Sequence, residues 1–236
     1  MSEDAYASAV LLAAGRSARM GLSAEGLRKP FLCVAGRSLI EHALATFGAC
    51  PSVREIILVA HPDDMDAARK ALSAAGLGSS TCIEGGAERT DSVRLGFERT
   101  TDPSEVILIH DVARPLVLVE QIEGVARAAR ESGGALLATP VRDTIKMVDD
   151  GRSVSTLDRS RLWAAQTPQG FRRTEFAEAL EMSKALGMDA TDDAALYERH
   201  VGHPVIVESG PENLKLTVPA DVPLAEALLR RRSEES

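Results

Sequence analysis

Short runs of aliphatic residues recur along the chain, and a more polar segment follows each of them. The runs are SAVLLA (residues 8–13), EIILVA (55–60), EVILI (105–109) and GALLAT (134–139). Continuous apolar runs of this length are typical of strands that are buried on both faces of a mostly parallel sheet. We therefore expect these runs to form the centre of such a sheet.

Segments with helical periodicity alternate with these runs. In residues 118–131, Leu118, Ile122, Val125 and Ala129 recur at a spacing that places them on one face of a helix. The predicted helices cover residues 38–49, 62–76, 88–99, 118–131, 173–186 and 192–200. Alternating strands and helices predict a doubly wound α/β fold, in which helices cover both faces of a mostly parallel sheet.

The pattern changes after Pro140. TIKMV (144–148) and SVSTL (154–158) are more polar, and they flank a plausible hairpin turn at residues 149–151. These two strands predict a β-arm that projects from the sheet, with Trp163 as a buried anchor near it. A lone two-stranded ribbon is marginally stable in water and usually needs a partner surface. Residues 213–217 predict a late strand, and a C-terminal helix is expected through Leu229.

Charge and cysteine content narrow the classes of function. The net charge of −8 argues against nucleic-acid or membrane binding, and the 3% of aromatic residues offers few stacking platforms for single strands. Cys33, Cys50 and Cys82 are widely spaced, which is typical of reduced thiols in a cytoplasmic protein. We found no signal peptide and no apolar run of membrane-spanning length, so we expect a cytoplasmic protein.

A basic loop follows the first predicted strand, at the edge of the sheet where ligands bind in such folds. Gly15, the first glycine of this loop, permits a close approach of the backbone to a phosphate. The loop matches neither the dinucleotide motif G-x-G-x-x-G nor the P-loop motif. A small polyanion is the expected ligand, and a solvated charged loop is the alternative. The cations of residues 14–37 are Arg16, Arg19, Arg28, Lys29 and Arg37.

The motif IHDVARP (109–115) places Asp111 directly after another apolar strand. A carboxylate at this edge can hold Mg²⁺, the usual companion of nucleotide phosphates. The alternative is an aspartate that caps the next turn, and the motif by itself does not decide between the two.

The motif EGGAERTDSV (84–93) joins a predicted strand to a helix through Gly85 and Gly86. The N-terminus of that helix offers N–H groups to an anion or to a base edge. An ordinary turn with Asp91 or Ser92 as a local cap is the alternative.

Eight motifs occur together in a fixed order. They are LAAGRSARMG, RKP, GGAERTDSV, HDVARP, PVRDTIK, LDRSRLWAAQTPQGF, ATDDAAL and NLKLT. In this order the sequence resembles 2-C-methyl-D-erythritol 4-phosphate cytidylyltransferases over roughly residues 7–230. The resemblance implies a Rossmann-like nucleotidyltransferase fold in a single domain, residues 1–236, and a homodimer formed through an arm at about 141–161.

The resemblance also implies the reaction. CTP and 2-C-methyl-D-erythritol 4-phosphate would give 4-diphosphocytidyl-2-C-methyl-D-erythritol and pyrophosphate, with Mg²⁺ as the cofactor, in isoprenoid precursor synthesis. The same chemistry on another polyol phosphate, such as ribitol 5-phosphate, is an alternative. Transfer from a nucleotide with a different base and a catalytically silent nucleotide-binding regulator are two others.

Roles for individual residues follow from the same resemblance. The catalytic cations would be Arg19, Lys29, Arg159 and Lys215. The nucleotide would be bound by Ala13, Ala14, Gly15, Gly86, Ser92 and Asp111, and Asp111 would also hold the metal. The acceptor would be bound by Arg114, Thr144, Thr167 and Thr191. The arm would carry Thr144 and Arg159 into the site of the neighbouring subunit. Departures from the family pattern that bear on nucleotide contacts are Ser17, Pro30, Ala87 and Val112.

Overall fold

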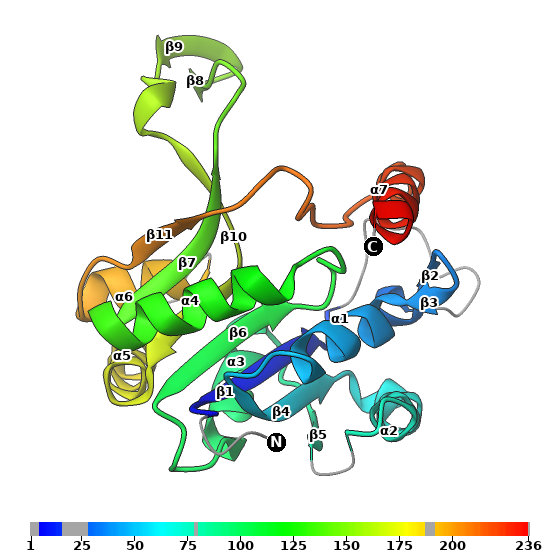
Figure 1. The fold of residues 1–236 in the computed structure, drawn as a ribbon. Coiled ribbons are helices and arrows are strands. Elements are labelled where there is room, and N and C mark those ends of the chain that lie inside the picture. The colour runs from blue at the N-terminus through cyan, green and yellow to red at the C-terminus, as the bar shows by residue number, and fades with distance from the viewer. Residues whose placement is uncertain (1–4, 16–27, 78–79, 187–191, 236) are drawn as a thin grey trace.

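The protein is described by a computed structural model over residues 5–15, 28–77, 80–186 and 192–235. Within these residues a seven-stranded sheet lies between two layers of helices (Figure 1). Its strands are β1 (Ala7–Ala13), β4 (Val53–Ala60), β5 (Thr81–Glu84), β6 (Val106–Asp111), β7 (Gly134–Pro140), β10 (Trp163–Arg172) and β11 (Val205–Glu208).

The order of the strands across the sheet is β5-β4-β1-β6-β10-β7-β11. The pairs β1–β4, β1–β6, β4–β5 and β7–β11 are parallel, and β10 is antiparallel to both of its neighbours. From β1 the chain moves outward to β4 and β5 and then returns to β6 on the other side. The crevice beside β1 is therefore the topological switch point, where ligands bind in doubly wound sheets. The predicted fold class is confirmed.

Helices cover both faces of the sheet because β1, like its neighbours, directs apolar side chains to each face. Ala7, Ala9 and Leu11 pack into the cluster beneath α1, α2, α4 and α7, and Val10 packs into the cluster beneath α3, α5 and α6. The bounds of these helices are α1 (Leu39–Gly48), α2 (Met65–Ala74), α3 (Arg89–Arg99), α4 (Val119–Ser132), α5 (Arg173–Leu186), α6 (Asp193–His200) and α7 (Asp221–Glu235).

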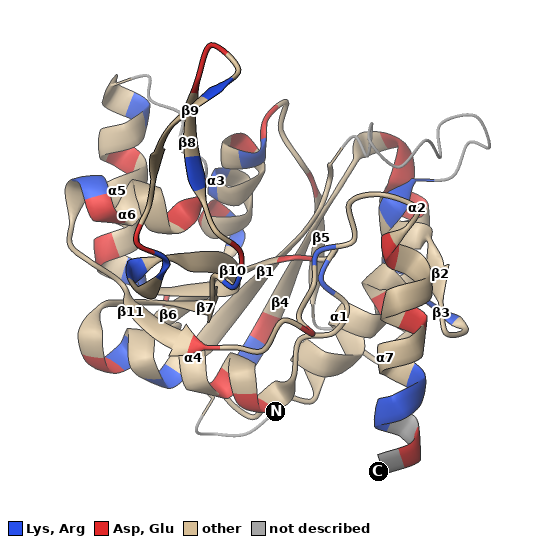
Figure 2. Ribbon diagram, turned by 90° about the horizontal axis from the view of Figure 1, so that it is seen from above, with Lys and Arg blue, Asp and Glu red and all other residues tan. Residues whose placement is uncertain are grey.

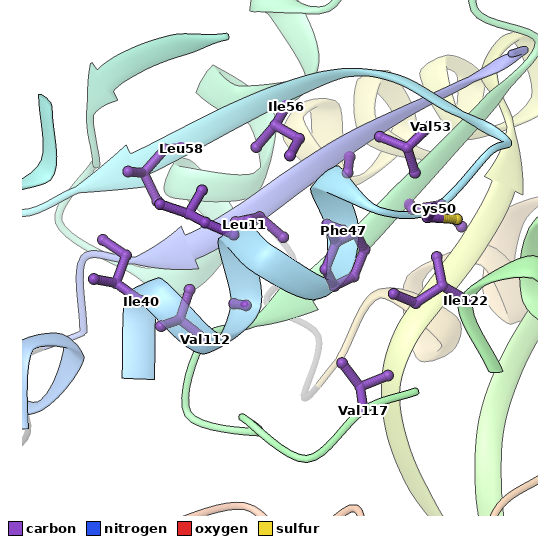
Figure 3. Close-up of a cluster of buried hydrophobic side chains, with 14 of the residues drawn as sticks. Leu11, Ile40, Phe47, Cys50, Val53, Ile56, Leu58, Val112, Val117 and Ile122 are labelled. Atoms are coloured by element: carbon purple, nitrogen blue, oxygen red, sulfur yellow. The ribbon is translucent and has the colours of Figure 1, made fainter. Parts of the chain in front are cut away.

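The first of these clusters is shown in Figure 3. Phe47 and Ile40 extend from α1 towards the sheet, where Leu11 of β1 and Leu58 of β4 meet them. All four side chains are fully buried. This packing fixes the strands whose carboxyl ends form the crevice.

Short elements complete the fold. Strands β2 (Cys33–Val34) and β3 (Arg37–Ser38) form a small hairpin before α1, which begins with a capping box between Ser38 and Glu41. The described residues also contain the 3₁₀-helices η3 (Lys29–Phe31), η4 (Pro62–Asp64) and η5 (Arg159–Arg161).

The predicted arm is present. Among the described residues, strands β8 (Lys146–Asp149) and β9 (Arg152–Thr156) pair only with each other, and they project from the sheet between β7 and β10 (Figure 1). Asp150 and Gly151 join them with φ of 43° and 72°, which matches a two-residue hairpin turn of type I′. Every residue of both strands is exposed, including Met147, Val148 and Val154 at 52–63%.

Two expectations are wrong. Residues 213–217 form no strand, because they cross the carboxyl edge of the sheet and bond to the loop after β6 through Leu216 N–H and Ala113 O. The last strand along the described chain is instead β11. Trp163 is 39% exposed and not buried, because it lies at the base of the arm, opposite Pro140.

Charged groups of both signs are interspersed across the helices and the arm (Figure 2). In that view neither sign is confined to one side of the described residues. None of the helices in the described residues has the length and apolar character to cross a membrane.

Helix α3 lies unusually close to the sheet at Gly96. A Cβ atom at this position would overlap the side chain of Val10 and would lie 3.1 Å from Val59 Cγ2. Replacing Gly96 with alanine should lower the free energy of unfolding by up to about 2 kcal/mol, because overpacking costs about 1–3 kcal/mol and the gain in helix propensity offsets only about 1 kcal/mol of it. Thermal unfolding measures this change as a Tm lower by a few degrees.

Gly124 of α4 provides the matched control. A Cβ atom there would meet Val207 Cγ1 at 3.4 Å, an ordinary contact. Gly124→Ala should leave the Tm unchanged or raise it. An equal effect of the two substitutions would contradict the close packing of α3.

Candidate active site

A cleft of about 790 Å³ opens at the carboxyl ends of β1, β4, β5 and β6. Its walls come from the loops after these strands, from the start of α3 and from the segment before α7. The predicted site residues that line it are Ala13, Ala14, Gly15, Lys29, Gly86, Ser92, Asp111 and Lys215. The residues predicted to bind the nucleotide and two of the predicted catalytic cations, Lys29 and Lys215, therefore meet at the switch point.

Asp111, the last residue of β6, lies between two cations. Lys215 donates from Nζ to Oδ2 at 2.5 Å, and Arg89 donates from Nε to Oδ1 at 3.3 Å. Burial alone would raise the pKa of the Asp111 carboxyl, but Arg89 and Lys215 together hold this pKa well below its usual range. The carboxylate is therefore ionised throughout the physiological range of pH.

Arg89 contacts a second carboxylate. Its Nη1 and Nη2 donate to Oδ1 and Oδ2 of Asp193 at 3.1 and 2.7 Å, and Asp193 is 4% exposed. Burial opposes the charge of the guanidinium, but the two carboxylates outweigh it and raise the pKa of Arg89. One guanidinium thus joins α3, the end of β6 and the start of α6.

A buried polar network supports Asp111 from behind. Residues 166–168 leave the β10 ladder, and the Thr167 hydroxyl accepts the Asp111 N–H at 3.1 Å and bonds His110 Nδ1 at 3.1 Å. Burial lowers the pKa of His110 to about 4, so its ring is neutral at pH 7. Arg114 donates to Asn213 O at 2.7 Å. Neither Thr167 nor Arg114 is among the residues that line the cleft.

Lys29 is placed by the 3₁₀-turn η3. Pro30 occupies the first turn of η3 and is buried, a position where the missing N–H of proline costs little. This departure from the family pattern is therefore accommodated. Arg28 forms ion pairs with Asp63 at 2.5 Å and with Asp64 at 3.2 Å. Lys29 consequently lines the cleft, while the neighbouring Arg28 anchors the end of the basic loop to η4.

The Gly85–Gly86 turn brings β5 and α3 against the loop after β1. A Cβ atom on Gly85 would overlap that of Ala14, so only glycine fits this approach. Ser92 Oγ accepts the Gly86 N–H at 3.1 Å, and Asp91 accepts the Glu88 N–H at 3.2 Å. The local capping bonds are thus present in a turn that also lines the cleft.

The donor set near Asp111 fits a divalent cation only in company with phosphate. Among the described residues, no three histidine, cysteine or acidic side chains gather into a ligand group. Mg²⁺ in nucleotide sites is usually bound by one or two carboxylates together with substrate phosphates. Asp111, at the bottom of a cleft large enough for a nucleotide, meets that requirement.

The remaining predicted residues lie elsewhere. Thr144 and Arg159 are exposed on the arm, and Arg159 Nη1 donates to Arg142 O at 2.8 Å. Neither lines the cleft of its own chain. Arg19, Ser17 and Thr191 lie outside the described residues.

Sequence reasoning missed Arg89 and Asp193. Both stand inside quoted motifs, GGAERTDSV and ATDDAAL, directly at the predicted start of a helix. Their opposite charges were the only available signal, and a separation of 104 positions concealed the pairing.

Comparisons with known proteins point to one family. The family model of 2-C-methyl-D-erythritol 4-phosphate cytidylyltransferase matches residues 7–231. The protein of that name from Symbiobacterium thermophilum is 40% identical over 230 residues, which cover 97% of this chain and 94% of that protein.

Two crystal structures are similar over nearly their whole lengths. A 4-diphosphocytidyl-2C-methyl-D-erythritol synthase from Anaerococcus prevotii has a TM-score of 0.85 at 30% identity, covering 96% of this chain and 97% of that one. A 2-C-methyl-D-erythritol 4-phosphate cytidylyltransferase from Thermus thermophilus has a TM-score of 0.77 at 33% identity, covering 94% and 98%.

Proposed function

The chain belongs to the 2-C-methyl-D-erythritol 4-phosphate cytidylyltransferase family, and we propose that its cleft transfers the cytidylyl group of CTP to 2-C-methyl-D-erythritol 4-phosphate. The products are 4-diphosphocytidyl-2-C-methyl-D-erythritol and pyrophosphate. This reaction is a step in the synthesis of isoprenoid precursors. One observation carries the assignment to this cleft. Lys29, Asp111 and Lys215 come from distant parts of the chain and line the same cavity at the switch point.

The reaction needs positive charge more than it needs a base. An oxygen of the acceptor phosphate attacks the α-phosphorus of CTP, and the bond from that phosphorus to the oxygen that bridges it to the β-phosphorus breaks. Pyrophosphate leaves with the electron pair. Because the acceptor phosphate is already an anion, no proton has to be removed from it. Lys29 and Lys215 offset the repulsion between the two anions and the charge that develops in the transition state.

Each predicted residue has a place in this scheme. Arg19 and Lys29 contact the α-phosphate, and Lys215 and Arg159 position the acceptor. The loop after β1 and the start of α3 bind the nucleotide through Ala13, Ala14, Gly15, Gly86 and Ser92. The acceptor is bound by Arg114, Thr144, Thr167 and Thr191.

Asp111 would hold Mg²⁺ together with the triphosphate. The ion neutralises phosphate charge and acts as a Lewis acid on the phosphoryl group when it is bound. Both oxygens of Asp111 are engaged by Lys215 and Arg89, so the carboxylate offers little to a metal that arrives without phosphate.

The arm, residues 141–161, forms a homodimer in this proposal, and the rest of the single domain carries the nucleotide cleft. Three apolar side chains of the arm, Met147, Val148 and Val154, are more than half exposed. A ribbon that pairs only with itself requires another surface for stability. Its Thr144 and Arg159 then serve the cleft of the partner subunit. The cytoplasm is the expected compartment, in line with three free cysteines.

Substrate and metal requirements test the proposal directly. Among the four nucleoside triphosphates CTP should release pyrophosphate fastest, and among several polyol phosphates, ribitol 5-phosphate included, 2-C-methyl-D-erythritol 4-phosphate should be the best acceptor. Removal of divalent ions with EDTA should abolish release, and Mg²⁺ should restore it. In titration calorimetry Mg²⁺ without CTP should bind only weakly. Efficient release without any divalent ion would refute the role of Asp111.

A further inference from the structure

Arg89 lies where three separate elements of the cleft meet. It is the first residue of α3, and its guanidinium contacts Asp111 at the end of β6 and Asp193 at the start of α6. Its side chain is 33% exposed and lines the cleft, whereas Asp193 is almost fully buried. The division of its donors is specific: both Nη atoms bond Asp193, and only Nε is directed to Asp111.

The start of α6 does not need Asp193 for its own stability. Asp192 already caps the helix, since its Oδ1 accepts the Ala195 N–H at 2.9 Å. Gln169 of β10 anchors the same turn from both ends of its amide, donating to Asp192 Oδ2 at 2.9 Å and accepting the Ala194 N–H at 2.8 Å. A second carboxylate buried beside this complete cap is costly unless it is paired. Its paired partner is Arg89.

We propose that Arg89 is a positioning residue that holds the Asp111 carboxylate in place, and that Asp193 in turn fixes Arg89. The inference rests on the proposed role of Asp111. A fork of two parallel N–H bonds to Asp193 leaves the guanidinium one orientation, with Nε towards Asp111. Lysine carries the same charge but lacks that planar fork, and so cannot hold both carboxylates in this way.

The arrangement gives Asp111 one fixed partner and one exchangeable partner. Lys215 is 40% exposed on a flexible stem and can turn from Asp111 to a phosphate that enters the cleft. Arg89 cannot follow, because Asp193 binds it from the buried side. Asp111 therefore keeps its orientation when Lys215 departs. Groups that orient a metal ligand in this way typically change metal affinity by about 10–100-fold when they are replaced.

The test is calorimetric binding of CTP with and without Mg²⁺, in the absence of acceptor, so that turnover plays no part. The affinity ratio between the two titrations isolates the contribution of the ion. Arg89→Lys and Asp193→Asn should each lower this ratio by about 10-fold or more. CTP binding without Mg²⁺ should stay near that of the wild type. The double variant should be no worse than either single variant, because the two residues act as a unit.

The control pair lies on the same helix. Arg94 and Glu98 form an exposed ion pair at 3.1 Å, and Arg94→Lys and Glu98→Gln should leave the ratio unchanged. The variant Asp111→Asn distinguishes the proposed role of Asp111 from the positioning role of Arg89 and Asp193. If Asp111→Asn keeps the full effect of Mg²⁺, the proposed role of Asp111 fails.

If Asp111→Asn loses that effect while Arg89→Lys and Asp193→Asn keep it, the positioning role is refuted and the proposed function stands. A lower Tm in either variant with an unchanged affinity ratio would assign the pair to stability alone, and would equally overturn the inference.

Discussion

Replacing Lys29 with alanine should lower kcat by about 10²-fold or more. Lys29 lines the cleft, and in the proposed mechanism its ammonium group is one of the preorganised charges that stabilise the transition state. The loss of one such charge typically costs a factor of this size. Pyrophosphate release under saturating CTP and acceptor measures the change. Lys29 is half-buried at the first position of η3 and is not part of the hydrophobic core. The Tm should therefore remain close to that of the wild type.

Lys70 serves as the matched control, since it is an exposed lysine on α2 and does not line the cleft. Lys70→Ala should retain full activity. Activity of Lys29→Ala within a few-fold of the wild type, with unchanged thermal unfolding, would contradict the assignment of Lys29 to the α-phosphate.

Mixing two inactive variants should restore activity if the arm completes the site of its partner. Lys29→Ala and Arg159→Ala place their lesions in different parts of the molecule, one in the cleft and one on the arm. In a mixed dimer with a shared site, one site carries both lesions and the other carries neither. Random twofold assembly makes half of the dimers mixed, so activity should recover to about a quarter of the wild-type value.

If Arg159 served the cleft of its own subunit, every site would keep one lesion and no activity would return. Exchange of subunits has to be demonstrated independently, for example with differently labelled chains. A mixture that exchanges subunits and yet stays inactive would exclude the shared site. Each variant incubated with itself under the same conditions provides the baseline.

The parts of the fold that could be predicted are those in which burial is continuous. Four strands, β1, β4, β6 and β7, are aliphatic runs covered on both faces, and their positions follow from the runs of aliphatic residues in the sequence. β10 was missed because its sequence, WAAQTPQGFR, is polar and small in the middle. There residues 166–168 leave the ladder so that Thr167 can reach Asp111. At that point the contact of Thr167 with Asp111 interrupts the regular alternation that would mark a strand in the sequence.

The same reasoning explains the error over residues 213–217. NLKLT alternates as a strand does, and Leu216 is fully buried as the pattern requires. Its backbone, however, runs across the ends of the strands and finds its partners in the loop after β6. Leu216 N–H bonds Ala113 O, and Asn213 O accepts a bond from Arg114. Alternation reports which side chains are buried and does not report what pairs with the backbone.

The candidate site could be located from the sequence only in part. The loop after β1 and Asp111 follow apolar strands, so their place at the carboxyl edge could be derived. Lys215 could be assigned to the site only through the family resemblance, because 104 positions separate it from Asp111 and no local pattern marks it. Arg89 and Asp193 are also 104 positions apart in the sequence, and only the folded chain brings them together.

The stem of the arm suggests how this architecture can be altered over evolutionary time. Pro140 and Trp163 face each other in the ladder between β7 and β10, and Val141 N–H bonds Leu162 O at 3.0 Å just beyond them. Topologically, the arm is a long insertion into an ordinary antiparallel hairpin. Its length and much of its sequence can change while the register of the seven strands stays the same. The segment that we propose for subunit association can therefore evolve separately from the strands that form the cleft, except at Thr144 and Arg159, which the proposal assigns to the site of the partner subunit.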